Sequence, residues 1–108
     1  PPPDSKNANH TVYHIVHENP PGAKDLLTAD EQGKHNNKDQ CMRVGISVFT
    51  KYEDANFRLS QMPFLGKHIA YGELRPKHGN IKQTGKPSHH TWWPSDGIRR
   101  DTIFRVEE

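Results

Sequence analysis

The sequence predicts an α+β domain: a small, mostly antiparallel sheet with one or two helices. Short runs rich in β-branched and aromatic residues recur along the chain, one longer segment has helical spacing, and Gly- or Pro-containing turns separate them. The chain has 108 residues, of which 31% are hydrophobic, which suits one domain with a small core. Residues 1–10 (PPPDSKNANH) are nearly devoid of apolar side chains and are predicted to be a disordered leader, followed by the domain over residues 11–108.

Residues 11–17 (TVYHIVH) form the first predicted strand, because β-branched and aromatic residues dominate it and the following ENPPG stops it. A short helix is predicted for residues 23–30 and a polar loop for residues 31–40. Residues 43–49 (RVGISVF) are predicted to form the second strand, with Val44, Ile46 and Val48 on one face.

Residues 51–62 are predicted to form an amphipathic helix, because apolar residues recur there at helical spacing. Thr50 and Glu53 form a capping-box pattern at its start, and Pro63 ends it. The remaining strands are predicted at residues 68–74, 81–84, 91–93 and 102–107.

Charge and cysteine content restrict the class of protein. Basic and acidic residues are intermixed and the formal net charge is +2, which gives only modest support to nucleic-acid binding. The single cysteine, Cys41, cannot form an intramolecular disulfide, and no segment has the character of a membrane span or a signal peptide. We therefore expect a cytoplasmic protein. No pair of ligands stands at a familiar metal spacing, so no metal site is predicted.

Two histidines near the first predicted strand are candidate site residues. His14 and His17 stand three residues apart, so they point to opposite faces. His14 shares its face with Val12 and Val16, where a core position is the alternative to a binding role. His17 lies at the strand end, beside Glu18, and is better placed to reach a cleft.

Residues 88–97 (SHHTWWPSDG) are a second candidate region, because they hold both tryptophans and two adjacent histidines. Adjacent residues of a strand face opposite sides, so either Trp92 or Trp93 is expected to be exposed or to line a groove. An indole beside an imidazole is a suitable platform for a nucleobase or a nicotinamide ring. The alternative is that Trp92 fills the core while Trp93 caps a sheet edge.

Glu73 is a candidate general base or partner of ribose hydroxyls, because it alternates with Tyr71 and Ile69 near the end of a predicted strand. A solvated surface glutamate is the alternative. No Gly-x-Ser-x-Gly elbow surrounds Ser47, and no phosphate-binding glycine-rich loop is present.

The order of these segments resembles that of small bacterial ADP-ribosyltransferase-like proteins of unassigned function. The resemblance lies in TVYHIVHENPP, in GISVFTKYEDANF, where a strand runs into a helix, in GKHIAYGEL and in the late SHHTWW block. In that superfamily an early strand carries an Arg or His that holds the cofactor. A later strand with a hydroxyl or aromatic residue leads into a helix, and a late strand often presents a Glu.

The resemblance implies a domain that binds NAD or a related nucleotide, with ADP-ribosyltransferase or NAD glycohydrolase activity. His14 or His17 would hold the cofactor. Ser47 or Tyr52 would be the hydroxyl or aromatic residue at the strand that leads into a helix. The role of the late-strand glutamate would fall to Glu73 or to the histidines of the SHHTWW block.

The combined prediction places the site in a cleft between the GISVF strand and the SHHTWW block. The predicted catalytic residues are His17, Glu73 and His90. The predicted cofactor-binding residues are His14, Ser47, Tyr52 and Trp93.

Two other functions fit the same residues. A metal-independent ribonuclease would use one histidine to activate a ribose 2′-hydroxyl and another to protonate the leaving oxygen, with Arg99 or Arg100 on the phosphate. A non-enzymatic protein-binding domain would use an exposed Trp93 as its interface anchor. The expected partner is therefore a nucleotide, with RNA or a protein target as the alternatives.

Overall fold

The computed structural model describes residues 1–34 and 39–107, and within them seven strands form one mostly antiparallel sheet accompanied by two α-helices. This confirms the predicted α+β class. The strands lie in the order β1-β5-β6-β3-β2-β4-β7. Their bounds are Lys6–Asn7 (β1), His10–Val16 (β2), Ile46–Phe49 (β3), His68–Leu74 (β4), Gly79–Gln83 (β5), His89–Pro94 (β6) and Phe104–Val106 (β7).

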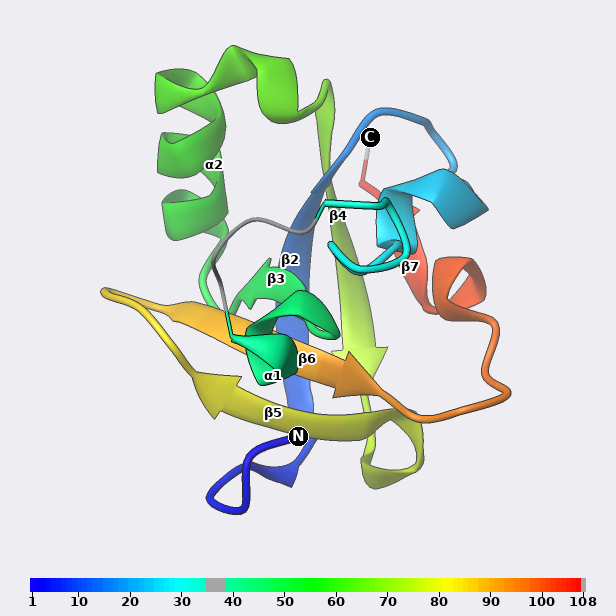
Figure 1. Ribbon diagram of the computed structural model, residues 1–108. Helices are drawn as coiled ribbons and strands as arrows, with labels where there is room; N and C mark the ends of the chain where they lie inside the picture. Colours follow the sequence, from blue (N-terminus) through cyan, green and yellow to red (C-terminus); the bar gives the residue numbers. More distant parts are fainter. Residues whose placement is uncertain (35–38, 108) are drawn as a thin grey trace.

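The longer helix, α2 (Tyr52–Gln61), packs against β2, β3 and β4 on one side of the sheet (Figure 1). We call this side the α2 face and the opposite side the core face. The shorter helix, α1 (Gln40–Arg43), directly precedes β3. Short 3₁₀ helices complete the structure at Ala23–Leu26, Pro63–Leu65, Pro76–His78 and Arg100–Ile103.

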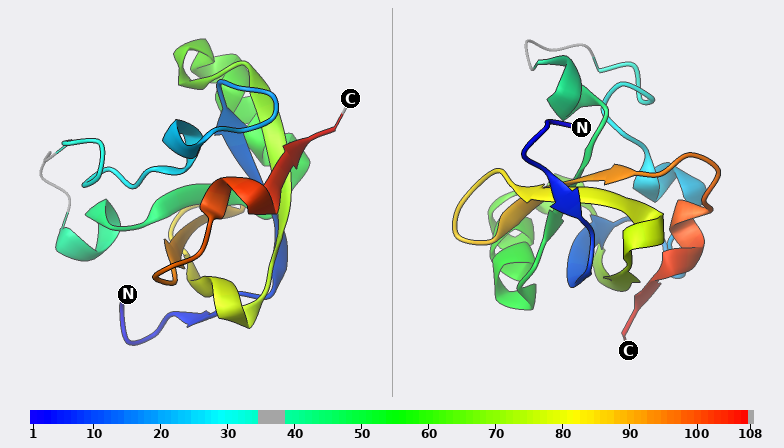
Figure 2. Two further views of the ribbon diagram at one scale, coloured as in Figure 1. Left: turned by 90° about the vertical axis from the view of Figure 1, so that its right-hand side faces the viewer. Right: turned by 90° about the horizontal axis from the view of Figure 1, so that it is seen from below.

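The sheet curves around its core face. Strands β6 and β7 are separated by three strands in the sheet order, yet the rings of Trp92 and Phe104 lie 5.8 Å apart across the core. In Figure 2 this curvature is seen because the strands of one half of the sheet run across those of the other half. Val12, Val16 and Val48 fill the space between the halves and are fully buried, as the alternation of side chains along β2 and β3 requires.

The sheet opens between β2 and β3. Strand β2 pairs with β4 along its whole length, from His10 opposite Leu74 to Val16 opposite His68. With β3 it pairs only at Tyr13, opposite Phe49. The two halves of the sheet therefore meet at a single residue pair and diverge on either side of it.

The second predicted strand begins later than expected. Residues 43–49 were predicted to be one strand, but β3 begins at Ile46, and α1 occupies the preceding segment. The Asp39 carboxylate accepts a hydrogen bond from the Met42 N–H at 3.0 Å and caps this helix, a local interaction that competes with an extended backbone. Val44 does not share the face of Ile46 and Val48 as predicted, because it lies outside β3 and is exposed, whereas those two are buried.

Helix α2 lies where the sequence predicts it, but it begins without the predicted capping box. Its first flanking residue is Lys51, and no side chain caps it. The Thr50 N–H donates instead to the carbonyl of Ser88 at 3.2 Å, which keeps Thr50 attached to the sheet. The helix can therefore start only after Lys51.

Residues 1–10 differ from the expected disordered leader. Lys6 and Asn7 form β1, which pairs with β5 at the edge of the sheet. Ala8 is fully buried in the core, and its N–H donates to the Gly79 carbonyl at 2.9 Å. One small apolar residue and a backbone ladder thus hold a segment whose composition alone predicts disorder.

The loop predicted over residues 31–40 includes residues 35–38, which lie outside the described residues. The helix predicted over residues 23–30 is the 3₁₀ helix Ala23–Leu26, and the last predicted strand is shortened to β7 by the 3₁₀ helix before it. Among the residues that the structure describes, no helix combines the length and the apolar character needed to cross a membrane.

Candidate functional site

Four ring-bearing residues form a continuous row across the α2 face. His89, Phe49, Tyr13 and Tyr71 lie on the adjacent strands β6, β3, β2 and β4, each directly opposite the next in register. The rings of Phe49 and His89 meet edge to face at 5.4 Å. Because directly opposed residues share a face of a sheet, these four rings form one surface, which we call the aromatic row.

Cationic side chains lie over two rings of this row. The Arg58 guanidinium, from α2, lies 5.4 Å from the centre of the Phe49 ring. The Arg105 guanidinium, from β7, lies 5.4 Å from the centre of the Tyr71 ring. The electron-rich faces of aromatic rings attract cations at such distances. Two rings of the row therefore already contact cations of the protein itself.

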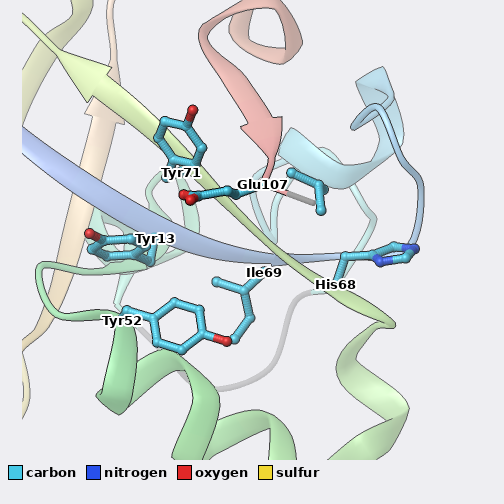
Figure 3. Close-up of a pocket in the computed structure, with 7 residues that line it drawn as sticks. Tyr13, Tyr52, His68, Ile69, Tyr71 and Glu107 are labelled. Atoms are coloured by element: carbon cyan, nitrogen blue, oxygen red, sulfur yellow. The ribbon is translucent and has the colours of Figure 1, made fainter.

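A cavity of about 190 Å³ lies at the Tyr13–Tyr71 end of the row, and we call it the tyrosine pocket. Tyr52, from the first turn of α2, meets Tyr13 edge to face, with ring centres 5.9 Å apart and planes at 84°. Figure 3 shows the Glu107 side chain reaching toward Tyr71 and Tyr13. The complete lining is Tyr13, Tyr52, His68, Ile69, Tyr71, Val106 and Glu107.

The size and lining of the tyrosine pocket restrict what it can hold. Sites for drug-sized ligands have volumes of about 300–1,000 Å³, so a cavity of about 190 Å³ suits a single ring rather than a whole dinucleotide. Three phenol rings offer flat apolar walls, and one carboxylate offers a negative charge. In Figure 3, His68 points away from this group.

His14 bridges the opening between β2 and β3 from the core face. Its Nδ1 lies 2.8 Å from the Ser47 carbonyl oxygen, and its Nε2 lies 2.6 Å from the Asp25 carbonyl oxygen. Desolvation lowers the pKa of His14 below its ordinary value, against the opposing effect of the two carbonyl contacts. His14 therefore connects both halves of the sheet to the 3₁₀ helix Ala23–Leu26.

Glu73 lies on the α2 face, two residues beyond Tyr71 on β4. The Thr11 hydroxyl donates to its Oε1 at 2.5 Å, and Arg75 Nη2 lies 3.1 Å from its Oε2. Two residues of a strand span about 7 Å, so Glu73 lies next to the aromatic row. Its exposed carboxylate is suited to accept hydrogen bonds from hydroxyl groups of a ligand in the tyrosine pocket.

His10 and His90 form a separate pair on the core face, with ring centres 6.0 Å apart. The Asn9 N–H donates to His10 Nδ1 at 3.3 Å, which makes that nitrogen an acceptor. His90 Nδ1 lies 2.8 Å from the Ser88 carbonyl oxygen, a position that requires it to donate. Desolvation, and then the neighbouring His90, lower the pKa of His10.

Both tryptophans are buried, so neither indole is exposed, and of the two predicted arrangements only that of a tryptophan lining a hollow applies, to Trp93. Trp92 is 0% exposed and Trp93 4%. Trp92 Nε1 donates to the His78 carbonyl at 3.0 Å, and Trp93 Nε1 donates to the Cys41 carbonyl at 2.7 Å. Trp93 is covered on the α2 face by the segment around α1, which strand alternation alone does not reveal. It also lines a second cavity, of about 400 Å³, together with Cys41 and Lys82.

The structure separates the predicted catalytic residues. His17 follows the end of β2 where Val16 pairs with His68, whereas Glu73 pairs with Thr11 near the other end. Six residues of strand, about 20 Å, separate the two positions along β2. His90 lies near the Glu73 end but on the core face, opposite in side to Glu73.

Among the predicted cofactor-binding residues, Tyr52 lines the tyrosine pocket, and Ser47 is exposed on β3, two residues before Phe49. The predicted cleft between the GISVF strand and the SHHTWW block is absent within the described residues, because β3 and β6 are directly paired neighbours. Their shared α2 face instead presents the Phe49 and His89 end of the aromatic row.

Sequence reasoning missed the residues that complete the aromatic row and the tyrosine pocket. Tyr13, Phe49 and Tyr71 each occur at alternating positions of predicted strands, and that alternation places them off the Val12 face. It does not give the register between strands, which aligns them in space. Glu107 carries no signal in the sequence, because it approaches the pocket only through the pairing of β7 with β4.

No protein-family model matches the chain, and no curated protein or solved structure matches it either. Within residues 1–34 and 39–107, no group of three or more His, Cys, Asp or Glu side chains is arranged to hold a metal ion. The function must therefore be argued from the aromatic row, the tyrosine pocket and the histidine pair.

Proposed function

We propose that this domain binds NAD or a related nucleotide on the α2 face, with the nicotinamide ring or base in the tyrosine pocket. One observation carries the proposal: a ring-sized cavity walled by Tyr13, Tyr52 and Tyr71 lies at the end of a row of aromatic side chains. Stacking on such rings stabilises a bound base by about 1–3 kcal/mol.

The neighbouring groups fit the rest of a dinucleotide. Arg58 and Arg105 put positive charge at two points of the row, where a diphosphate would be attracted. Glu73 lies about 7 Å from Tyr71 along β4, and its carboxylate would accept hydrogen bonds from ribose hydroxyls. In a transferase or glycohydrolase reaction, nicotinamide leaves from an oxocarbenium-like ribose, and Glu73 would steady that sugar.

The resemblance to ADP-ribosyltransferase-like proteins adds support of a different kind. Three of its four segments, the early His-bearing strand, the strand that runs into a helix and the late SHHTWW strand, correspond to β2, β3 and β6. These strands are neighbours, with β3 in the centre. Segments that are far apart in the sequence thus form adjacent strands of one sheet, which supports a shared site. ADP-ribosyltransferase or NAD glycohydrolase activity is the corresponding catalytic proposal.

Isothermal titration calorimetry with NAD tests the proposal. Tyr52 is 51% exposed, so Tyr52→Ala is expected to weaken NAD binding about tenfold or more while the melting temperature stays nearly unchanged. The matched control is Phe57→Ala, since Phe57 lies on the same helix, is 65% exposed and does not line the pocket. Equal affinity in both variants, or no binding to the folded wild-type protein, would contradict the proposal.

The histidine pair favours a second candidate function, a metal-independent ribonuclease. The contact of His90 leaves its Nε2 with a lone pair, as a general base requires. The contact of His10 leaves a proton on its Nε2, which would donate a hydrogen bond to the leaving oxygen. Arg100 is engaged by the Glu31 carboxylate at 2.6 and 3.2 Å and by the Leu26 carbonyl. The phosphate role therefore falls to Arg99 alone.

Cleavage of a short RNA, followed by gel electrophoresis, tests this second function. His10→Ala and His90→Ala should each abolish cleavage, whereas Tyr52→Ala should leave it intact, because Tyr52 lies on the other face. An absence of cleavage by the wild-type protein, or cleavage unaffected by both histidine variants, would remove this candidate.

A further inference from the structure

We propose that a second copy of this chain docks on the outer side of α2, so that two copies form an antiparallel dimer with two-fold symmetry. The dimer goes beyond the proposed nucleotide site and does not depend on it. Four exposed residues, which follow one another along α2 and the 3₁₀ helix Pro63–Leu65, form the docking surface. They are Glu53, Phe57, Phe64 and Lys67, and we call them the docking ridge.

The two large apolar side chains of the docking ridge lie in solvent. Phe57 is 65% exposed and Phe64 is 71% exposed. Ala55, two residues before Phe57, is fully buried, and successive residues of a helix turn by about 100°, so Phe57 lies on the side of α2 away from the sheet. In Figures 1 and 2, α2 and the 3₁₀ helix after it form an outer margin of the molecule. Large apolar side chains exposed together in this way mark an interaction surface.

Charge is divided along the same part of the chain. Residues 51–54, at the start of α2, carry a net charge of −1, and residues 55–67 carry a net charge of +2. Neither Glu53 nor Lys67 forms a salt bridge with another described residue, so both are available to a partner. A second copy that runs in the opposite direction brings opposite charges together.

The order of the four residues is self-complementary. Glu53 precedes Phe57 by four residues, and Lys67 follows Phe64 by three. A two-fold axis close to residue 60 sets Phe57 of each copy against Phe64 of the other, and Glu53 of each copy against Lys67 of the other. Such contacts use the same surface twice and close the assembly at two copies. An anionic lipid surface fits less well, because it would repel Glu53, which lies one helical turn from Phe57 on the same side of α2.

The docking ridge is separate from the tyrosine pocket. Tyr52 and Phe57 lie five residues apart on α2, which places them about 140° apart around the helix axis. Of these two residues, only Tyr52 lines the pocket. Dimer formation and nucleotide binding can therefore be lost independently of each other.

Sedimentation equilibrium at protein concentrations from about 1 µM to about 1 mM tests the inference. We expect a reversible equilibrium between monomer and dimer, which Phe57→Ser and Phe64→Ser should each weaken about tenfold or more. The matched control is Val44→Ser, since Val44 is also an exposed apolar residue, 38% exposed, but lies outside α2. This control should leave the dissociation constant unchanged.

An exchange of charges tests how the two copies are arranged. Glu53→Lys and Lys67→Glu should each weaken the dimer severalfold, because each places like charges opposite one another. The double variant restores opposite charges and should return the dissociation constant to within about twofold of the wild-type value. Circular dichroism checks that each variant is folded.

Four results would overturn the proposal or its geometry. A wild-type protein that stays monomeric up to about 1 mM would overturn the dimer. A dimer unaffected by Phe57→Ser and Phe64→Ser would overturn the docking ridge as its interface. A double charge variant as weak as the single variants would overturn the antiparallel pairing of Glu53 with Lys67. Cosedimentation of a monomeric protein with phosphatidylserine vesicles would assign the ridge to a lipid surface and overturn the dimer.

Discussion

The two faces of the sheet use the same strands in different ways. On the core face, both ring nitrogens of His14 lie within hydrogen-bond distance of backbone carbonyls, and the Trp92 indole N–H donates to another. On the α2 face, Tyr13, Tyr52 and Tyr71 surround a cavity, and no hydrogen bond of the described residues involves their hydroxyl groups. Alternation along a strand thus assigns the packed core to one face and the tyrosine pocket to the other.

This difference explains where substitutions should act. A side chain whose polar atoms are matched inside the core leaves an unsatisfied group or a cavity when it is replaced. Replacing a side chain at the edge of an open pocket leaves neither a buried unsatisfied group nor a new cavity. Core-face variants should therefore change stability, and α2-face variants should change ligand binding.

Trp92→Ala should cause the largest loss of stability. Trp92 is fully buried against Phe104 and hydrogen-bonds to the His78 carbonyl, so we expect a loss of about 3–5 kcal/mol in the free energy of unfolding. Urea denaturation measures this loss. In the same assay Tyr52→Ala should lose about 0.5 kcal/mol or less. Comparable losses in the two variants would erase the distinction between the faces.

Acid should destabilise the fold through the core-face histidine His14. Its folded pKa lies below its unfolded value, so the stability it contributes is present above about pH 6.5 and is lost as the pH falls below that value. The slope attributable to His14 reaches about 1.4 kcal/mol per pH unit. Urea denaturation at pH 7.5 and 5.5 should show a smaller loss in His14→Gln than in the wild-type protein. An identical loss in both would exclude His14 as the source.

Thr11→Val should have the smallest effect. The Thr11 hydroxyl donates to Glu73 on the exposed α2 face, where water can replace it, so we expect a change of less than about 1 kcal/mol. A thermal melt measures this change. A loss as large as that of a core-face variant would show that Thr11 and Glu73 belong to the structural framework instead.

The sequence predicts the strands and the long helix because their signals are local. Residues 68–74 and 51–62 follow strand and helix periodicities, and β4 and α2 lie there. The start of β3 was misplaced because the Asp39 cap, which competes with the strand, carries a weaker local signal. The burial of both Trp92 and Trp93 depends on which segment covers the far face of β6, and that is a tertiary property.

The sequence predicts less of the candidate site than of the fold. Tyr52 and Glu73 were selected for their residue types, and both lie at or beside the aromatic row. Tyr13 and Tyr71 were not selected, because strand register, which brings them opposite each other, is set by long-range pairing. Glu107 depends on two successive strand pairings and could not be placed without them.

The most direct test of the proposed nucleotide site is a nuclear magnetic resonance titration of the protein with NAD⁺. It would measure intermolecular nuclear Overhauser effects from the nicotinamide ring protons. We expect these effects to reach the ring protons of Tyr13, Tyr52 and Tyr71 on the α2 face. Effects that reach His10 and His90 on the core face instead, or a folded protein whose spectrum does not change, would contradict the assignment of binding to the α2 face.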